Sequence, residues 1–520
     1  YTLDRTLRWV QRQVAPTLKM LKKIDKGNGT DYMEMIEQQA KLTERRAREA
    51  KKIRNREYTI VSYFFVCIFI SLVVYMVYFE LEKKDSIINS PYNTRQDQFE
   101  DRVVRGRILS ADGQTLAYTQ VNEDETETRI YPFNNLFAHI VGYDSNGKNG
   151  LESLANFELM TSHDGYVKQV KNEMQETKNQ GDNVVTTLNT SLQQTAYDAL
   201  GDNQGAVVVM DPKSGAVLAM VSKPDFNPNT VSQDWDYLTS DSSNSSLLNR
   251  ATQGAYPPGS VFKIVTTLAY LRSENGNLDN FTYTCDGSIT VDDHTISCYD
   301  GEEHGTEDFE TAFAKSCNSA FANLGMELGA KKLTSAAESL LFNKKLPISI
   351  SYNSSKFDLG DHPGNPLLMQ TSIGQGNTLV SPMHMALIVS AIANDGVLMK
   401  PYYIQQVQNV NGDVVSKTKT SEYKTLMTKE EASRLKQLMQ EVVNRGTASA
   451  LSGESYSAAG KTGSAEYYGS DGSIHTHSWF VGMAENDESQ LVVAVIAEGA
   501  GTGSSVAVPI AHQIFNQYYY

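Results

Sequence analysis

The sequence predicts an α+β fold for residues 181–520, with a central antiparallel sheet flanked by helices, and three observations predict this architecture. Strand-like apolar stretches near both ends of this region, at 205–221 and 476–497, enclose a helical middle. About 100 polar residues with short strand-like pieces precede the region and predict a small β-rich spacer. An uncharged apolar run precedes the spacer and predicts a single membrane helix.

The first 57 residues are basic. They contain fifteen Lys and Arg against eight Asp and Glu, a net charge of +7. The net charge of the whole chain is −15, so the remaining residues carry −22. Apolar residues recur at helical spacing between Leu3 and Leu21, which fits an amphipathic helix on a membrane or one face of a partner-bound or fused segment. Residues 31–57 are expected to run as a helix into the apolar run. Because the basic residues stand beside that run rather than on a folded domain, nucleic-acid binding is not expected.

Residues 58–79 contain no charged side chain. About 20 apolar residues span a bilayer as a helix, so this run predicts one transmembrane helix. The alternative is a cleaved signal peptide, which the length of the run and the absence of a small-residue cleavage site after it oppose. Four Lys and Arg crowd residues 51–56, whereas only two lysines, at 83 and 84, follow the run. The positive-inside rule therefore predicts a membrane protein with a cytoplasmic N-terminus and an extracytoplasmic remainder.

Turn signals divide the chain after the apolar run. In the spacer, R-G-R-I-L at 105–109 and the D-G pair that follows predict strand, turn and strand. Further on, 184–188 is expected to be a strand and 191–200 a helix that begins at a Thr or Ser cap. The stretch 205–221 predicts a core hairpin around a K-S-G turn. The predicted parts are a cytoplasmic segment, 1–57, a transmembrane helix, 58–79, an extracytoplasmic spacer, 80–180, and the larger domain, 181–520.

Three short motifs in fixed order carry the chemistry. They are Ser260 and Lys263 in S-V-F-K, Ser316 and Asn318 in S-C-N, and Lys461, Thr462 and Gly463 in K-T-G. A serine hydroxyl is a poor nucleophile unless a neighbouring group removes its proton. Together the motifs supply a nucleophile, a proton-handling group and a carboxylate-binding strand. These are the parts needed to acylate an enzyme with a peptide that ends in a free carboxylate.

The same letters recur elsewhere, so context has to separate the motifs from chance matches. S-x-x-K recurs at 416–419, 421–424 and 433–436, S-x-N at 242–244 and 351–353, and K-S-G at 213–215. Y-P-P-G precedes Ser260 as a stop and turn, and apolar residues follow it. Ser260 is therefore predicted at a helix N-terminus, with Lys263 one turn later on the same face. The rival S-x-x-K matches lie in a polar stretch, where solvated lysines are the ordinary interpretation.

Lys263 is the predicted general base for Ser260. An amine accepts a proton only when it is neutral, and burial together with the nearby positive charge of Lys461 is expected to lower the pKa of Lys263 toward working pH.

With these residues the chain resembles the class B penicillin-binding proteins, membrane-anchored D,D-transpeptidases of bacterial cell-wall synthesis. Further blocks are similar to that family: R-G-R-I at 105–108, G-L-E at 150–152, N-R-A at 249–251, K-T-G-S-A-E at 461–466 and H-S-W-F-V-G at 477–482. The resemblance implies a penicillin-binding transpeptidase fold. It also implies a reaction in which Ser260 takes the acyl group of a stem peptide ending in D-alanyl-D-alanine, with release of D-alanine. A neighbouring stem peptide's amine then receives the acyl group, and β-lactams acylate the same serine.

The resemblance also implies roles for the remaining motif residues. Ser464 stands where many members have threonine, a change that preserves a role for its backbone N–H. Ser316 is implied to relay a proton, and Asn318 to orient Lys263 or bind the substrate amide. Lys461 would supply positive potential, Thr462 would bind the substrate carboxylate, and Gly463 would leave room for the substrate backbone. The backbone N–H groups of Ser260 and Ser464 would form an oxyanion hole.

Two other functions are weighed against the transpeptidase. The first is a hydrolase on the same scaffold, a D,D-carboxypeptidase or a β-lactamase, which the spacer and the membrane anchor oppose. The second is a β-lactam sensor or a scaffold, which would need a larger intracellular part than residues 1–57. The spacer is too short to polymerise glycan. By resemblance, a separate membrane glycosyltransferase of the SEDS family is the expected partner.

Cysteines do not add a metal site or a cofactor to this prediction. Cys285 and Cys298 lie on the predicted oxidising side of the membrane, where a local disulfide and free thiols are both open. His294 lies between them, but no paired C-x-x-C or H-x-x-x-H spacing supports zinc. Cys67 lies in the membrane span, and Cys317 is expected to be a small buried filler. The sequence therefore predicts no metal and no cofactor.

Overall fold

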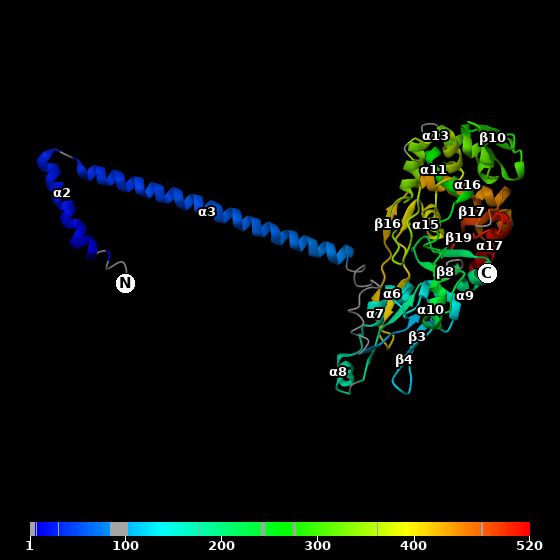
Figure 1. The fold of residues 1–520 in the computed structure, drawn as a ribbon, viewed down its shortest axis with the longest axis horizontal. Helices are drawn as coiled ribbons and strands as arrows, with labels where there is room; N and C mark the ends of the chain where they lie inside the picture. The colour runs from blue at the N-terminus through cyan, green and yellow to red at the C-terminus, as the bar shows by residue number, and fades with distance from the viewer. Residues whose placement is uncertain are drawn as a thin grey trace. The chain divides into compact units, whose positions relative to one another are not determined.

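The computed structural model describes residues 6, 8–29, 31–83, 102–175, 177–240, 245–273, 277–360, 362–469 and 472–520. The chain divides into two units, Tyr1–Ile87 and Ile88–Tyr520 (Figure 1). Lys84, one of the two lysines expected to flank the membrane helix, lies outside the described residues.

The first unit is helical. Its elements are η1 (Val10–Val14), α2 (Ala15–Asn28), α3 (Tyr32–Tyr78) and η2 (Phe79–Lys83). Gly29 ends α2 in a left-handed conformation, with φ of 65°, as is common after a helix C-terminus. The Asp31 carboxylate then accepts the backbone N–H of Glu34 and caps α3. The prediction that 31–57 continues as a helix into the apolar run is confirmed, because α3 is continuous through both.

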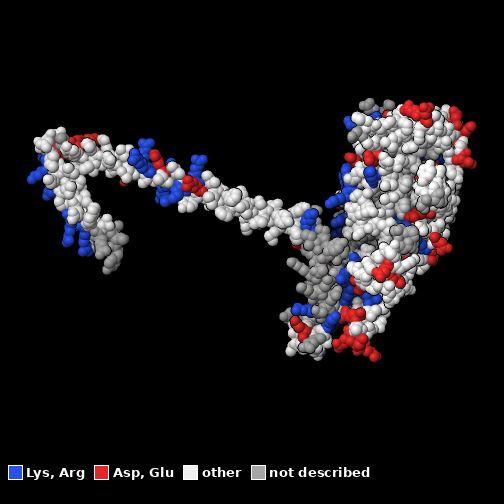
Figure 2. Space-filling view, in the orientation of Figure 1, with Lys and Arg blue, Asp and Glu red and all other residues white. Residues whose placement is uncertain are grey.

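The second half of α3 is long and apolar enough to cross a membrane. Its most apolar window has a mean hydropathy of 2.6, and none of that window is buried within the protein. Figure 2 shows this part of α3 as an uncharged stretch, with Lys and Arg gathered on the helix before it. Leaving this many apolar side chains in water is costly, so a lipid environment is the physical explanation for the helix.

The second unit contains a six-stranded sheet with the order β15-β14-β6-β2-β3-β4. The strand–turn–strand predicted in the spacer is confirmed, because β2 and β3 pair antiparallel. On its other side β2 pairs parallel with β6, with Ile108 opposite Val184. The sheet thus joins segments from both sides of residue 180, and the division there stays a prediction. The strands are β2 (Ile108–Leu109), β3 (Thr115–Val121), β4 (Glu127–Ile130), β6 (Asn183–Thr186), β14 (Ile404–Gln408) and β15 (Val414–Lys417).

Short helices and a parallel strand pair complete this part of the unit. They are β1 (Val103–Val104) with β5 (Asn179–Gln180), η4 (Asn134–Phe137), α5 (Ala138–Val141), α6 (Gly150–Leu154), α7 (Asn156–Leu159) and α8 (Tyr166–Met174).

The R-G-R-I and G-L-E blocks meet here. Arg105 Nε donates to Glu152 Oε2 at 2.7 Å, and Arg129 Nε donates to Oε1 at 2.8 Å. Burial alone would raise the pKa of Glu152, but the two guanidinium groups outweigh it and hold that pKa below its usual value.

We expect Glu152→Gln to destabilise the second unit. The glutamine keeps the shape of the side chain but leaves two buried guanidinium groups without a countercharge, which costs about 3 kcal/mol for a broken buried pair. The matched control is Glu127→Gln, because Glu127 pairs with Lys178 nearer the surface, where such a pair contributes about 1 kcal/mol or less. Melting temperatures of the full chain in detergent provide the measurement. Equal shifts in the two variants would contradict the structural role of Glu152.

The second sheet has the order β17-β18-β19-β7-β8, and all its neighbours are antiparallel. The predicted hairpin around the K-S-G turn is confirmed as β7 and β8. The strands are β7 (Gly205–Met210), β8 (Val217–Lys223), β17 (Ser457–Tyr468), β18 (Ile474–Glu485) and β19 (Gln490–Ala497). The predicted helix after β6 is also present, as α9 (Thr190–Leu200). Its predicted Thr or Ser cap is wrong, because the Asn189 side chain accepts the N–H of Leu192 at 2.9 Å.

Helices cover this sheet on two sides (Figure 1). The α9 helix packs against α17 (Val508–Tyr519) and against β7 and β8, while α15 (Pro382–Ala393) packs on β7, β18 and β19. Every residue of α15 is buried, which makes it a core helix. This confirms the predicted α+β fold with an antiparallel sheet flanked by helices. The remaining helices are α10 (Val231–Ser240), η5 (Gly259–Phe262), α11 (Lys263–Leu271), η6 (Leu278–Asn280), η7 (Tyr299–Gly301), α12 (Phe309–Ala314), α13 (Asn318–Ser339), α14 (Asn365–Ser372), α16 (Lys429–Arg445), η8 (Ser449–Leu451) and η9 (Gly503–Ala507).

Short strands lie outside the two large sheets. They are β9 (Tyr283–Cys285), β10 (Ser288–Val291), β11 (His294–Ser297), β12 (Gly305–Glu307), β13 (Val397–Met399) and β16 (Glu422–Thr425). β9 pairs with β12, and β10 pairs with β11. Both pairs lie in the segment between α11 and α12, which precedes the S-C-N motif.

Candidate active site

Ser260 lies at the start of a buried helix, as predicted. It belongs to the 3₁₀ turn η5, which leads directly into α11, and Lys263 is the first residue of α11. Gly259 begins this turn with φ of 54°, a conformation that favours glycine. The Ser260 side chain is half-buried, whereas Lys263 is fully buried one turn later.

Two contacts fix the backbone in front of Ser260. The Gly259 N–H donates to the Gly374 carbonyl at 2.8 Å, and the Trp479 indole N–H donates to the Pro257 carbonyl at 3.1 Å. A Cβ on Gly374 would lie 1.9 Å from the Gly259 carbonyl oxygen, so only glycine fits there. The G-Q-G-N segment at 374–377 therefore supports the turn that presents Ser260.

The Lys263 amine holds the first two motifs together. Its Nζ donates to the Ser316 carbonyl at 2.6 Å, to Ser316 Oγ at 3.1 Å and to Asn318 Oδ1 at 2.7 Å. Among the described residues, Ser260 Oγ makes no hydrogen bond to Lys263; such catalytic contacts often tighten only when substrate binds. The first two motifs thus form one polar cluster around a buried amine.

Burial is the main cause of an altered pKa at Lys263. Burial lowers the pKa of this amine from 10.5 to about 8, and the negative potential of neighbouring groups, Cys317 first, opposes the shift. Lys461 was expected to lower the pKa of Lys263 as well, but the repulsion between the two amines lowers the pKa of Lys461 instead. Burial first, and the charge of Lys263 second, lower the pKa of Lys461 well below its usual value. A neutral amine near pH 8 is suited to accept a proton from a serine.

The S-C-N motif occupies a strained turn between α12 and α13. Ser316 has φ of 62°, a left-handed conformation that costs roughly 1–2 kcal/mol in a residue other than glycine. Asn318, two residues later, makes two contacts: its Oδ1 accepts from Lys263, and its Nδ2 donates to the Ser297 carbonyl at 2.9 Å. The carbonyl and hydroxyl of Ser316 consequently point to the Lys263 amine.

The K-T-G motif lies on β17, an edge strand that pairs only with β18 in the described part of the chain. Lys461 is fully buried, and its Nζ lies 5.6 Å from the centre of the Phe313 ring. The Lys461 Nζ also donates to the Thr462 carbonyl at 3.3 Å. The free edge of β17 leaves backbone N–H and C=O groups available to an extended peptide.

The hydroxyl groups of β17 contact residues outside the three motifs. Thr462 Oγ1 lies 2.5 Å from Thr447 Oγ1, and Ser464 Oγ accepts the N–H of Gly503 at 3.3 Å. Thr447 follows Gly446, and this G-T pair after an amphipathic helix was the only sequence signal available. The structure thus adds Thr447 as a partner that orients the Thr462 hydroxyl.

Gly463 is explained by packing within the protein. A Cβ at this position would lie 3.0 Å from the Pro258 carbonyl oxygen and 3.0 Å from Trp479 Cβ. The absent side chain therefore allows the turn before Ser260 to pack against β17. Room for a substrate backbone, the other role expected of Gly463, stays a prediction.

A half-buried carboxylate ties the N-R-A block to the Ser260 turn. Glu498 Oε1 accepts from Arg250 Nε at 2.8 Å and from the Tyr256 hydroxyl at 2.6 Å. The Tyr256 ring also meets the Trp479 ring edge to face. No sequence motif marked Glu498, because its partners are more than 200 residues away.

The rival motif matches lie elsewhere. Two of the S-x-x-K matches begin or end on β15 and β16, whose residues are all exposed, and the K-S-G match is the turn between β7 and β8. Lys436, in the third match, pairs with Glu485. The S-x-N match at 242–244 lies outside the described residues. These contexts support the choice of Ser260, Ser316 and Lys461, which stays a prediction.

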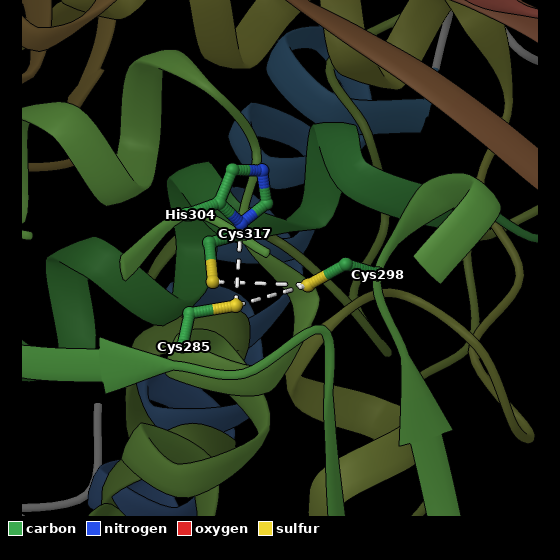
Figure 3. Close-up of side chains that lie close together, drawn as sticks. All are labelled: Cys285, Cys298, His304 and Cys317. Carbon is green, nitrogen blue, oxygen red and sulfur yellow. Dashed lines mark hydrogen bonds between the residues drawn. The ribbon is translucent and has the colours of Figure 1, made fainter. Parts of the chain in front are cut away.

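Cys317 belongs to a second group of side chains beside the site (Figure 3). Cys285, Cys298 and Cys317 are free and buried, and the Sγ atoms of Cys285 and Cys298 are 3.6 Å apart. The disulfide left open by the sequence is therefore not formed. His304 joins these cysteines, and the four side chains form a set that is able to hold a metal ion. His294 lies apart, with its Nε2 against Gln370.

A serine at a helix start, a buried amine one turn later and a second buried amine on an edge strand define a serine acyl-transfer enzyme. Residues 205–516 match the family described as penicillin binding protein transpeptidase domain, and 105–184 match the penicillin binding protein A dimerisation domain. Residues 1–36 match a family described as replication initiation factor.

Curated relatives and solved structures agree with these matches. The peptidoglycan D,D-transpeptidase PbpA of Mycolicibacterium smegmatis is 30% identical over 455 residues, which cover 82% of this chain and 91% of the relative. Penicillin-binding protein A of M. tuberculosis, solved as a ceftriaxone acyl-enzyme complex, has a TM-score of 0.73 at 29% identity and covers 82% of this chain and 100% of its own. A D,D-transpeptidase domain from Eggerthella lenta has a TM-score of 0.70 at 31% identity, with coverage of 80% and 98%.

The chain belongs to the penicillin-binding protein transpeptidase family, as a class B member with an N-terminal dimerisation-type domain.

Proposed function

We propose that this chain is a peptidoglycan D,D-transpeptidase that cross-links stem peptides through an acyl-enzyme on Ser260 and releases D-alanine. The observation that carries the proposal is the buried Lys263 amine, which contacts Ser316 and Asn318 and has a pKa of about 8. A serine hydroxyl one helical turn away from such an amine has a base within reach. The acyl-enzyme structure of the M. tuberculosis relative supports the same chemistry.

Acylation begins when neutral Lys263 removes the proton from Ser260 Oγ. The oxygen attacks the carbonyl carbon of the penultimate D-alanine, and the electron pair of that carbonyl moves onto its oxygen. Backbone N–H groups of Ser260 and Ser464 are proposed to bind this oxyanion, a contribution of roughly 10² to 10³ in rate for one such donor. The bond to the terminal D-alanine then breaks, and the departing nitrogen takes the proton from Lys263 by way of the Ser316 hydroxyl.

The K-T-G strand is proposed to bind the terminal carboxylate. The Thr462 hydroxyl, oriented by Thr447, donates to it, and Lys461 supplies positive potential to the same site when its amine is protonated. In the second half of the reaction, the amine of a neighbouring stem peptide loses a proton along the same relay and attacks the ester. Ser260 is regenerated, and two strands become joined.

We expect the rate of acylation to rise with pH and to level off above about pH 8. Because Lys263 acts as a base only when neutral, and burial sets its pKa to about 8, each unit of pH below 8 costs about tenfold in the reactive form. Acylation rates with a fluorescent penicillin at pH 6, 7, 8 and 9 give the profile, with the melting temperature measured at each pH as the control. A profile that is flat or falls between pH 6 and 8 would rule out Lys263 as the base.

Product analysis separates a transpeptidase from a hydrolase or a sensor. The full chain in detergent is incubated with polymerised lipid II, and the muropeptides are separated by chromatography and mass. A transpeptidase yields cross-linked dimers and one free D-alanine per link. Free D-alanine without dimers would indicate a D,D-carboxypeptidase, and penicillin labelling without turnover would indicate a sensor or scaffold.

The apolar helix supports a membrane-anchored enzyme. The excess of Lys and Arg before the apolar half of α3 supports a cytoplasmic N-terminus and an extracytoplasmic catalytic unit. A separate SEDS-family glycosyltransferase is proposed to supply the glycan polymer, because 80–180 is too short to polymerise it. Cross-linking and co-purification from membranes tests that partner, and failure to recover any glycan polymerase would remove it.

A further inference from the structure

Four side chains from four separate segments converge beside the S-C-N motif (Figure 3). Cys285 ends β9, Cys298 follows β11, His304 precedes β12, and Cys317 caps α13. We call them the Cys₃His cluster. Their candidate ligand atoms all lie within 4.8 Å of one another. The three cysteines are buried, and the side chain of His304 is only 3% exposed.

We propose that the Cys₃His cluster binds one zinc ion as a structural site. Sulfur ligands at ~2.3 Å from tetrahedral zinc lie roughly 3.8 Å from one another, and a sulfur and an imidazole nitrogen lie roughly 3.5 Å apart. The Sγ atoms of Cys285 and Cys298 are 3.6 Å apart, those of Cys298 and Cys317 are 3.9 Å apart, and Cys285 Sγ is 3.3 Å from His304 Nδ1. These separations match the edges of a zinc tetrahedron and exceed the ~2.05 Å of a disulfide bond.

The surroundings of the cluster also fit a metal site. A metal-bound imidazole commonly directs its second nitrogen to a carboxylate, and Glu302 Oε2 lies 3.7 Å from His304 Nε2. The Ser319 hydroxyl donates to Cys285 Sγ at 3.0 Å, and the Ala320 N–H donates to Cys317 Sγ at 3.4 Å. Donors of this kind stabilise thiolate, the form of cysteine that binds zinc.

The segment that supplies most of the ligands has little else to hold it together. All of 283–307 is described, and its strands are three or four residues long. Ile296 is the one buried aliphatic side chain in that segment. Small β segments with so small an apolar core are commonly stabilised by a disulfide or a metal. With no disulfide among these cysteines, zinc is the remaining cross-link.

The proposed ion would also hold the catalytic amine in place, a consequence that rests on the proposed function. Cys317 precedes Asn318, Cys298 follows Ser297, and Asn318 Nδ2 donates to the Ser297 carbonyl. Zinc would therefore fix both sides of the hydrogen bond that orients Asn318. Asn318 Oδ1 in turn accepts from Lys263. The cluster residues are positioning residues for this site, because none of them touches the reacting atoms.

Metal content tests the site independently of any activity. The full chain is purified in detergent with a tag that contains no histidine, and its metals are measured by mass spectrometry. We expect about one zinc per chain in the wild type, and at least a tenfold weaker hold on zinc in His304→Ala against a competing chelator. His294→Ala and Cys67→Ser are the matched controls, since both residues lie outside the cluster, and they should keep the metal.

A second measurement covers the case in which cluster variants fail to fold. The wild-type protein is stripped with a chelator and reloaded with cobalt, and tetrahedral thiolate coordination gives intense charge-transfer and visible bands. Stripping should also lower the melting temperature and slow penicillin acylation at least tenfold, with both restored by zinc. A wild type with no bound metal and no cobalt spectrum would overturn the proposal, as would a Cys285–Cys298 disulfide in the native protein. Zinc binding without an effect on acylation would retain the metal site and remove its positioning role.

Discussion

Replacing Lys263 with arginine is expected to slow the acylation of Ser260 by at least about 10³-fold, within the range lost when a general base is removed. Arginine keeps the positive charge and can still donate to Ser316 and Asn318, but it stays protonated in proteins and accepts no proton. The effect should therefore appear in the rate of covalent labelling by a fluorescent penicillin and much less in stability. Stopped-flow or time-sampled labelling of the full chain measures it.

The matched control for this variant is Lys436→Arg. Lys436 ends another S-x-x-K sequence but pairs with Glu485 at the end of β18. Its replacement should leave the labelling rate within about twofold, since arginine preserves such an ion pair. Equal losses in the two variants, or normal labelling by Lys263→Arg, would show that the base is another group.

Ser260→Ala is expected to abolish cross-linking altogether. Removal of the nucleophile from a serine enzyme that forms an acyl-enzyme costs about 10⁶-fold, which places the residual rate below detection. The protein should still fold, because Ser260 is half-buried and the turn is fixed by Gly259 and Trp479 through other contacts. Dimer formation on polymerised lipid II is the measurement, and an unchanged melting temperature and zinc content show that the fold is intact.

Ser433→Ala is the control for the nucleophile, because Ser433 begins the third rival S-x-x-K sequence. It lies on α16, away from the Lys263 amine. Cross-linking should continue at the wild-type rate. Dimers formed by Ser260→Ala at more than about one hundredth of that rate would mean that another residue carries the acyl group.

Local patterns predicted much of the fold. Three predictions depend on residues that lie close together in the chain, and each is confirmed. The apolar run is part of α3, the hairpin at 205–221 is β7 with β8, and the helix start after Y-P-P-G is η5. The N-cap of α9 was assigned wrongly, to Thr or Ser, because Asn189 in the preceding position caps equally well. The spacer boundary was drawn from a change in composition. Parallel pairing of β2 with β6 across it is a tertiary contact that composition does not encode.

The site was predictable where a motif carries it and not where distant residues complete it. Short motifs predicted Ser260, Lys263 and Asn318 as site residues. Glu498 acts through Arg250, which lies 248 residues away in the chain. Thr447 acts through Thr462, fifteen residues away, and only a G-T pair marks its position. His304 was missed for a similar reason. The cluster has ligand spacings of thirteen, six and thirteen residues, unlike the close pairs of familiar zinc motifs. His294, which lies between Cys285 and Cys298 in the sequence, was therefore the histidine considered as a ligand.

The position of the acyl group tests the central claim most directly. The full chain is labelled with a penicillin, digested, and mapped by tandem mass spectrometry. We predict one adduct per chain, with the mass of the intact penicillin, on the peptide that contains Ser260 and on that serine. An adduct on Ser416, Ser421 or Ser433, or no covalent adduct on a folded protein, would contradict the account.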